Sequence, residues 1–289
     1  MKTAWKLIIC WVAFVIALFA SSMFMKTMHL PEITPPGGTS LMLLLLAQLL
    51  AGAIIVLGLY PMAQHLRGDA AVRAMAAVAF LFLVLGVNDT IEARVFTNFV
   101  EGKIASVVLY NAVQAILVGI AVGMSFGASG QATGMAHRGW LALSSRGIIA
   151  WLAWPVIYFV FGMLIAPIVL PYYNAGIAGL RIPAPGTIVT VQLIRGLVFL
   201  AASLPLVALW KGSRLGLWGA LGLAHAAVVG ISGLAGATFF PWVLRITHSV
   251  EITADSFAYA GLLVLLFAAP SPRTAVAEPP PTEAHPLPL

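Results

Sequence analysis

Eight apolar runs, each of about 20 residues, divide this chain almost from end to end. A helical run of that length matches the hydrocarbon core of a bilayer, where only helices and closed barrels can satisfy their backbone groups. Hydrophobic residues make up 61% of the chain and charged residues 8%, against roughly 25% charged in soluble domains. The sequence therefore predicts an all-α integral membrane protein with spans at 5–25, 40–62, 72–94, 104–126, 147–169, 187–209, 215–237 and 247–269.

The distribution of basic residues predicts the orientation. Lys and Arg exceed Asp and Glu enough to give a net charge of +6, and most of the excess falls in alternate loops, on the side shared by both termini. Such loops usually face the cytoplasm. We therefore expect both termini to be cytoplasmic, in the inner membrane if the protein is bacterial, with the lipid bilayer and no nucleic acid as partner. The basic residues on that side are Lys2, Lys6, Arg67, Arg73, Arg138, Arg146, Lys211, Arg214 and Arg273.

The chain also looks like two related halves. The first run, "KLIICWVAFVIALFASSM", and the fifth, "RGIIAWLAWPVIYFVFGM", align without gaps and place Trp11 on Trp151. The pattern I-x-x-P-G precedes the second and sixth runs, and T-x-x-V-E-x-x-x-x-S introduces the fourth and eighth. The third and seventh runs show no convincing match, and chance similarity among apolar helices is the alternative. The first run also fits a cleavable signal peptide, but its counterpart in the fifth run favours a retained span.

From these matches we expect four spans in each half. Halves with an even number of spans have the same orientation, so they would be related by a pseudo-twofold axis along the membrane normal, which is a parallel repeat. The predicted organisation is a first repeat at 1–130, a second repeat at 131–270 and a disordered tail at 271–289, where Pro is frequent and apolar residues are few.

The repeated phrase places Glu101 and Glu251 at the outer ends of the fourth and eighth runs. Charges beside hydrocarbon are costly, and polar residues within spans are functional candidates by default. At about 100° per residue, His248, Glu251 and Asp255 share one helical face, and Arg195 is the one cation clearly inside a span. We expect Glu101, Glu251, His248 and Arg195 to converge on one extracytoplasmic cavity. The other candidates for binding a substrate or ion are Asp255, Asp89, Glu92 and Arg245.

Two facing carboxylates in a dry cavity can share a proton, hold a cation or pair with an arginine. His248, Glu251 and Glu101 could also supply ligands to a divalent metal, although H-x-x-E is a weak motif. The alternative is that both glutamates only cap helix starts, where a carboxylate favours the positive end of the helix dipole. A haem is not expected, because His225 in the seventh run has no second histidine at its depth and fits a hydrogen-bonded packing role.

Two further features concern packing. The glycines of the seventh run predict a central, closely packed helix; among them are Gly219, Gly222, Gly230, Gly233 and Gly236. Three prolines in the fifth run, Pro155, Pro167 and Pro171, could kink it and open a cavity. The aromatic residues that could line such a cavity, or else face lipid, are Trp151, Trp154, Tyr158, Tyr172 and Tyr173.

Three classes of function fit these features. The first is a carrier or binding protein for a small solute, linked to protons or a cation. The second is an integral membrane enzyme with an outward-facing acid–base or metal site built from Glu251, His248 and Glu101. The third is a non-catalytic membrane subunit. The chain has no C-x-x-C, H-E-x-x-H or G-x-S-x-G motif, so the sequence leaves open whether it is an enzyme.

Overall fold

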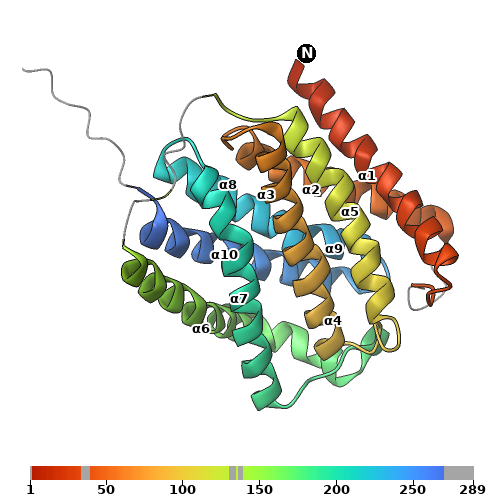
Figure 1. Ribbon diagram of the computed structural model, residues 1–289. Coiled ribbons are helices and arrows are strands. Elements are labelled where there is room, and N and C mark those ends of the chain that lie inside the picture. Colours follow the sequence, from red (N-terminus) through yellow and green to blue (C-terminus); the bar gives the residue numbers. More distant parts are fainter. Residues whose placement is uncertain (1, 34–39, 130–134, 136–138, 270–289) are drawn as a thin grey trace, which may run out of the picture.

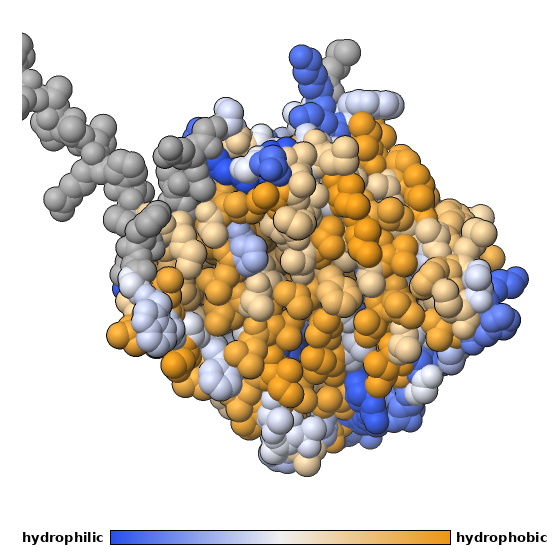
Figure 2. Space-filling model, viewed as in Figure 1, coloured by the Kyte–Doolittle hydropathy of each residue, from blue (hydrophilic) through white to orange (hydrophobic). Residues whose placement is uncertain are grey.

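The computed structural model describes residues 2–33, 40–129, 135 and 139–269. Within these residues, eight helices are long and apolar enough to cross a bilayer, and there is no strand. The all-α membrane class and the eight spans are confirmed. Figure 1 shows the helices packed side by side as a bundle, and the face in Figure 2 is apolar across its middle with hydrophilic residues gathered toward its edges. The chain is a polytopic membrane protein whose apolar helices suit a lipid bilayer.

Six spans are single helices, and two are broken into three segments each. The bounds are α1 (Lys2–Thr27), α2 (Leu41–Ala63), α3 (Ala70–Leu81), η1 (Phe82–Asn88), α4 (Asp89–Phe96), α5 (Ile104–Ser125), α6 (Trp140–Asn174), η2 (Ile177–Gly179), α7 (Pro185–Leu209), α8 (Arg214–Ala226), η3 (Ala227–Ile231), α9 (Ser232–Gly236) and α10 (Trp242–Phe267).

Two helices, α6 and α10, begin five or more residues before their predicted starts. Helix α6 has 35 residues and continues through all three of its prolines; it is also the least buried of the eight spans. Helix α10 begins at Trp242, directly after Pro241, because the fixed φ of proline favours a helix start. Hydropathy alone places that start near residue 247, because Arg245 and His248 lower the mean hydropathy of the residues around them. The difference moves Glu251 from the mouth of the helix to nearly the middle.

The third and seventh spans are the broken ones. The third runs from α3 through the π-helical segment η1 into α4, and the seventh from α8 through the π-helical segment η3 into α9. The two π-helical segments contact each other. Each follows an α-helix of nearly equal length, 12 residues in α3 and 13 in α8. The wider turns of a π-helix often mark functional sites, and here they lie next to the polar residues described below.

The helices of the two halves of the chain make equivalent sets of contacts. In the first half α1 packs on α2 and α5, and α3 packs on α5; in the second, α6 packs on α7 and α10, and α8 packs on α10. Across the halves, α2 contacts α8 and α7 contacts α3 (Figure 1). The second and third spans of each half therefore make the main contacts between the halves, and the seventh span is the most buried of all, as its glycines predicted.

One end of the bundle is closed by a pair of backbone hydrogen bonds between the halves. Leu66 and Trp210 form an isolated antiparallel bridge. The amide of Arg67 donates to the carbonyl of Leu209, and the amide of Lys211 donates to the carbonyl of His65, both at 2.9 Å. At the opposite end, Thr97 forms a bridge with Leu180. We call these the Leu66 end and the Thr97 end.

Several sequence predictions fall outside the described residues. They concern the first I-x-x-P-G motif, which extends into residues 34–39, the residue Arg138, and the tail at 271–289.

The close approach of α3 and α5 depends on Gly123. A Cβ added there would lie 2.3 Å from the Cα of Ala74 on the neighbouring helix, whereas a Cβ at Gly219 would meet nothing within 4 Å. We expect Gly123→Ala to lower the thermal stability of the purified protein by several degrees, because backbone atoms cannot yield as a side-chain end can. Gly219→Ala, the matched control, should leave stability unchanged or raised. Equal melting temperatures for the two variants would contradict this packing.

Candidate functional site

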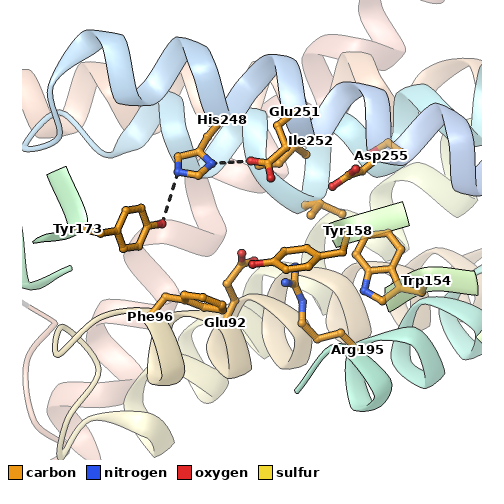
Figure 3. Close-up of a pocket in the computed structure, with 12 residues that line it drawn as sticks. Glu92, Phe96, Trp154, Tyr158, Tyr173, Arg195, His248, Glu251, Ile252 and Asp255 are labelled. Carbon is orange, nitrogen blue, oxygen red and sulfur yellow. Dashed lines mark hydrogen bonds and ion pairs between the residues drawn. The ribbon is translucent and has the colours of Figure 1, made fainter. Parts of the chain in front are cut away.

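A small polar cavity lies near the Thr97 end, between five spans. It measures about 50 Å³, which is room for a few water molecules or a compact head group. Helix α10 forms one wall with polar side chains, and α4, α6 and α7 form the others, with Val229 of η3 between them (Figure 3). The lining residues are Glu92, Phe96, Trp154, Tyr158, Tyr173, Arg195, Val229, His248, Glu251, Ile252, Asp255 and Ser256.

Arg195 is held on one side of the cavity by one hydrogen-bond partner for each of its three side-chain nitrogens. Its Nη2 donates to Glu92 at 2.7 Å, its Nε to the Oδ1 of Asn88 at 2.8 Å and its Nη1 to the Oε1 of Gln192 at 3.3 Å. The guanidinium carbon also lies 5.8 Å from the ring centroid of Trp154, a cation–π contact. The side chain is only 3% exposed. Through Asn88 and Glu92, Arg195 joins α7 to the third span at the point where η1 becomes α4.

The opposite wall carries a chain of three polar groups. The Nδ1 of His248 lies 2.7 Å from the Oε2 of Glu251, one helical turn further along α10. The Nε2 of His248 lies 3.4 Å from the hydroxyl of Tyr173 on α6. Glu251 is 7% exposed at its side chain, against 37% for Glu92 across the cavity. Figure 3 shows His248 between Tyr173 and Glu251, with Tyr158 below them.

Asp255 stands one turn beyond Glu251 on the same face of α10. The residue is 5% exposed, and its Oδ1 has no hydrogen-bond partner among the described residues. Buried polar atoms in folded proteins nearly always have a partner, and a buried carboxylate without one is costly. The Oδ1 of Asp255 is therefore an acceptor that the described residues leave free on the cavity wall.

The charges around the cavity do not balance. Three carboxylates, those of Glu92, Glu251 and Asp255, face one guanidinium and one imidazole. Even with His248 protonated, one negative charge is left over, and the guanidinium of Arg195 is already bound to Glu92. In a site of low dielectric constant such an excess attracts a cation or a proton.

Three residues expected at a shared site take other roles. Glu101 lies in the turn before α5 with half of its side chain exposed, and pairs with Arg181 at 2.9 Å and Arg94 at 3.7 Å; it does not line the cavity. Arg245 donates to the carbonyls of Leu234 and Ala235 at the end of α9. Asp89 accepts from Asn88 and also does not line the cavity.

The structure thus brings Glu92, Arg195, His248, Glu251 and Asp255 together and leaves Glu101, Asp89 and Arg245 outside. Glu101 and Glu251 do not face each other, because the shared phrase lies in a turn in one copy and inside a helix in the other. Within the described residues no group of three or more His, Cys, Asp and Glu side chains is arranged to hold a metal ion, so the proposed metal set of His248, Glu251 and Glu101 gains no support.

His225 has the packing role that its isolation suggested. It is buried, its Nε2 lies 2.8 Å from the hydroxyl of Ser203, and the rings of Phe80 and Phe199 contact it edge-on. Of the five aromatic residues considered as cavity-lining, Trp154, Tyr158 and Tyr173 do line it.

Sequence reasoning missed Asn88 and Gln192, which orient Arg195. A signal for both was present: each is an amide side chain inside an apolar run, Asn88 directly before Asp89 and Gln192 one helical turn before Arg195. Amides at such positions need partners within the protein.

No protein-family model, curated protein or solved structure matches the chain. The function is therefore inferred from the cavity.

Proposed function

We propose that this protein is a carrier or binding protein for a small solute, and that a cation or proton occupies the cavity between Glu251, Asp255 and the Glu92–Arg195 pair. The observation that supports it best is the unpartnered Oδ1 of the buried Asp255. Most buried polar groups are paired within the protein, as Arg195 is. Asp255 instead leaves an acceptor free on the wall of a space that can hold a ligand.

The depth of the site also favours binding within the membrane. Asp255 lies near the middle of α10, with nearly equal numbers of residues before and after it, and Arg195 lies near the middle of α7. Sites of secondary transporters usually lie near the bilayer midplane. The cavity extends from there toward Glu92, four residues from the end of α4, and so reaches from the middle of the bundle toward the Thr97 end.

Ligand-dependent thermal stability tests this proposal. A ligand that binds only the folded protein raises its melting temperature with concentration. Purified protein would be heated with Na⁺, K⁺, Mg²⁺, methylammonium or guanidinium across a range of pH. We expect at least one cation, or proton binding itself, to stabilise the wild type more than Asp255→Asn. If no cation and no change of pH distinguishes the two proteins, the cavity is not a cation or proton site.

We also infer that the chain arose by duplication of a four-span unit, with halves at 1–130 and 131–270. Trp11 donates through Nε1 to the carbonyl of Leu49, and Trp151 donates to that of Leu193; each carbonyl belongs to the ninth residue of its helix, α2 or α7. The parallel helix contacts, the paired π-helical segments and the reciprocal bonds between His65–Arg67 and Leu209–Lys211 support the same relation.

The duplication predicts how the halves overlay. Reciprocal hydrogen bonds between equivalent residues are what a twofold axis through the Leu66 end would produce, which suits a parallel repeat. In an experimentally determined structure, Trp11 should superpose on Trp151 and Gly68 on Gly212 after rotation about the membrane normal. A superposition that needs inversion of one half would contradict it.

Both termini are proposed to be cytoplasmic, with the Leu66 end inside. A single cysteine introduced at Arg214 should then react only with thiol reagents that cross the membrane, and one at Asn174 should react with impermeant reagents from outside. The background is low because the only native cysteine, Cys10, is buried. The opposite labelling pattern would reverse the topology and place the cavity toward the cytoplasm.

A further inference from the structure

A second hollow adjoins the polar cavity and opens on the side of the bundle. It measures about 190 Å³ and lies between α6, the start of α7 and the end of α4. Phe96, Tyr158, Tyr173, His248 and Glu251 line both spaces. The polar cavity and this groove are therefore neighbours that share a wall, with His248 and Glu251 at their junction.

The groove is apolar and faces the bilayer. Most of its lining residues are apolar, among them Met163, Ile165 and Val169 of α6, together with Ile182 and Ile188. At its mouth Met163, on α6, is 65% exposed, and Ile182, in the loop before α7, is 49% exposed; α6 is the least buried of the spans. Exposed apolar residues on such a helix contact lipid. A molecule dissolved in the bilayer can therefore enter the groove directly from within the membrane.

Gly162 leaves the junction open. A Cβ added there would meet only the Oε1 of Glu251, at 3.4 Å. The absence of a side chain at this point of α6 therefore exposes the carboxylate of Glu251 to the groove. A larger residue would stand between the apolar groove and the carboxylates behind it.

We propose that the ligand of this site is an amphipathic amine that enters from the bilayer, with its protonated amino group in the polar cavity and its apolar chain in the groove. Three features carry the proposal: the excess of carboxylates, the free Oδ1 of Asp255, and an apolar groove that begins at Glu251. An ammonium supplies three donors and one positive charge, which is what the carboxylates lack.

The dimensions agree with such a molecule. The polar cavity, at about 50 Å³, takes a primary ammonium but no bulky head group. The groove, at about 190 Å³, is smaller than the roughly 300 to 1,000 Å³ of pockets that enclose a whole drug-sized ligand. Part of the apolar chain of the ligand therefore stays in lipid. Because this apolar chain is in an apolar environment both before and after binding, the selectivity for the ligand comes from its head group.

Photolabelling in nanodiscs tests the proposal, which rests on the cation site proposed above. The probe is a long-chain primary alkylamine with a diazirine in its chain, and the control probe is the alcohol of equal length. We expect the amine to label groove residues such as Met163 and Ile188 at least about tenfold more than the alcohol does, since charge-assisted hydrogen bonds favour the ammonium. Adducts are located by peptide mass spectrometry.

Three variants assign the labelling to the site. Asp255→Asn should reduce the excess of amine over alcohol to nearly none, because it removes the acceptor for the ammonium. Gly162→Leu should also reduce the excess of amine labelling over alcohol labelling, because the leucine side chain fills the junction. Methylammonium should still stabilise this variant, since the polar cavity is unchanged. Gly147→Leu, on the same helix where an added Cβ meets only Leu200 at 3.8 Å, should label like the wild type. Ile188→Trp narrows the groove from α7 and replaces Gly162→Leu if that variant does not fold.

The outcomes separate this inference from the proposed function. Equal labelling by amine and alcohol, with methylammonium still stabilising the wild type and not Asp255→Asn, would overturn lateral entry and leave the cation site intact; the groove would then hold lipid chains only. Equal labelling without any stabilisation by methylammonium, other cations or pH would overturn both.

Discussion

Asp255→Asn should abolish cation- or proton-dependent stabilisation of the protein without lowering its folded yield. The substitution keeps the shape of the side chain and removes its charge. Because the Oδ1 of Asp255 has no partner, the change breaks no hydrogen bond at that atom and removes the cost of a buried charge. The unliganded variant should therefore be at least as stable as the wild type. Melting curves of the two proteins, with and without the stabilising cation or at different pH values, measure both effects.

The matched control is Asp69→Asn. Asp69 is an exposed residue that caps α3 by accepting from the amide of Val72, and asparagine caps helices equally well. It lies at the Leu66 end, away from the cavity. This variant should respond to the cation as the wild type does. If Asp255→Asn retains the full response, the free carboxylate oxygen does not take part in binding.

Arg195→Met should be the most destabilising single change near the cavity, at about 3 kcal/mol. It removes the partner of Glu92 and leaves the Oδ1 of Asn88 without its donor, together with the contact to the Trp154 ring. Glu92 is more than a third exposed, so water partly compensates for its loss and the effect is below the upper range for fully buried pairs. The expected result is a lower melting temperature and a smaller monodisperse fraction in size-exclusion chromatography.

Two further variants locate the cause. Glu101→Gln disrupts an exposed pair with Arg181 and Arg94 and should change stability by less than about 1 kcal/mol. The double variant Arg195→Met with Glu92→Gln should recover part of the loss, because it no longer leaves a carboxylate without its cation. A double variant that is as unstable as the sum of the two single changes would show that the Arg195–Glu92 pair is not what holds the third span to α7.

The sequence by itself determined the class, the number of spans and the importance of a few polar residues. Eight apolar runs suffice for this because, inside a bilayer, length and hydropathy leave the helix as the one local solution for each run. Arg195, Glu251 and Asp255 stood out for a related reason, since charge inside such a run is costly wherever it lies. The glycines of the seventh run predicted its central place, because close backbone approach needs small side chains.

Only the tertiary structure decided which charged side chains lie in contact with one another. Glu101 and Glu251 stand in the same sequence phrase, yet one lies in a turn and pairs with Arg181, and the other lies inside α10 beside His248. The start of α10 at Trp242 made that difference, and hydropathy could not find it. Arg195 pairs with Glu92, more than 100 residues away, through helix packing that brings α7 against the third span. Whether the Oδ1 of Asp255 has a hydrogen-bond partner likewise depends on the side chains of every neighbouring helix. The local sequence around Asp255 does not show which helices those are.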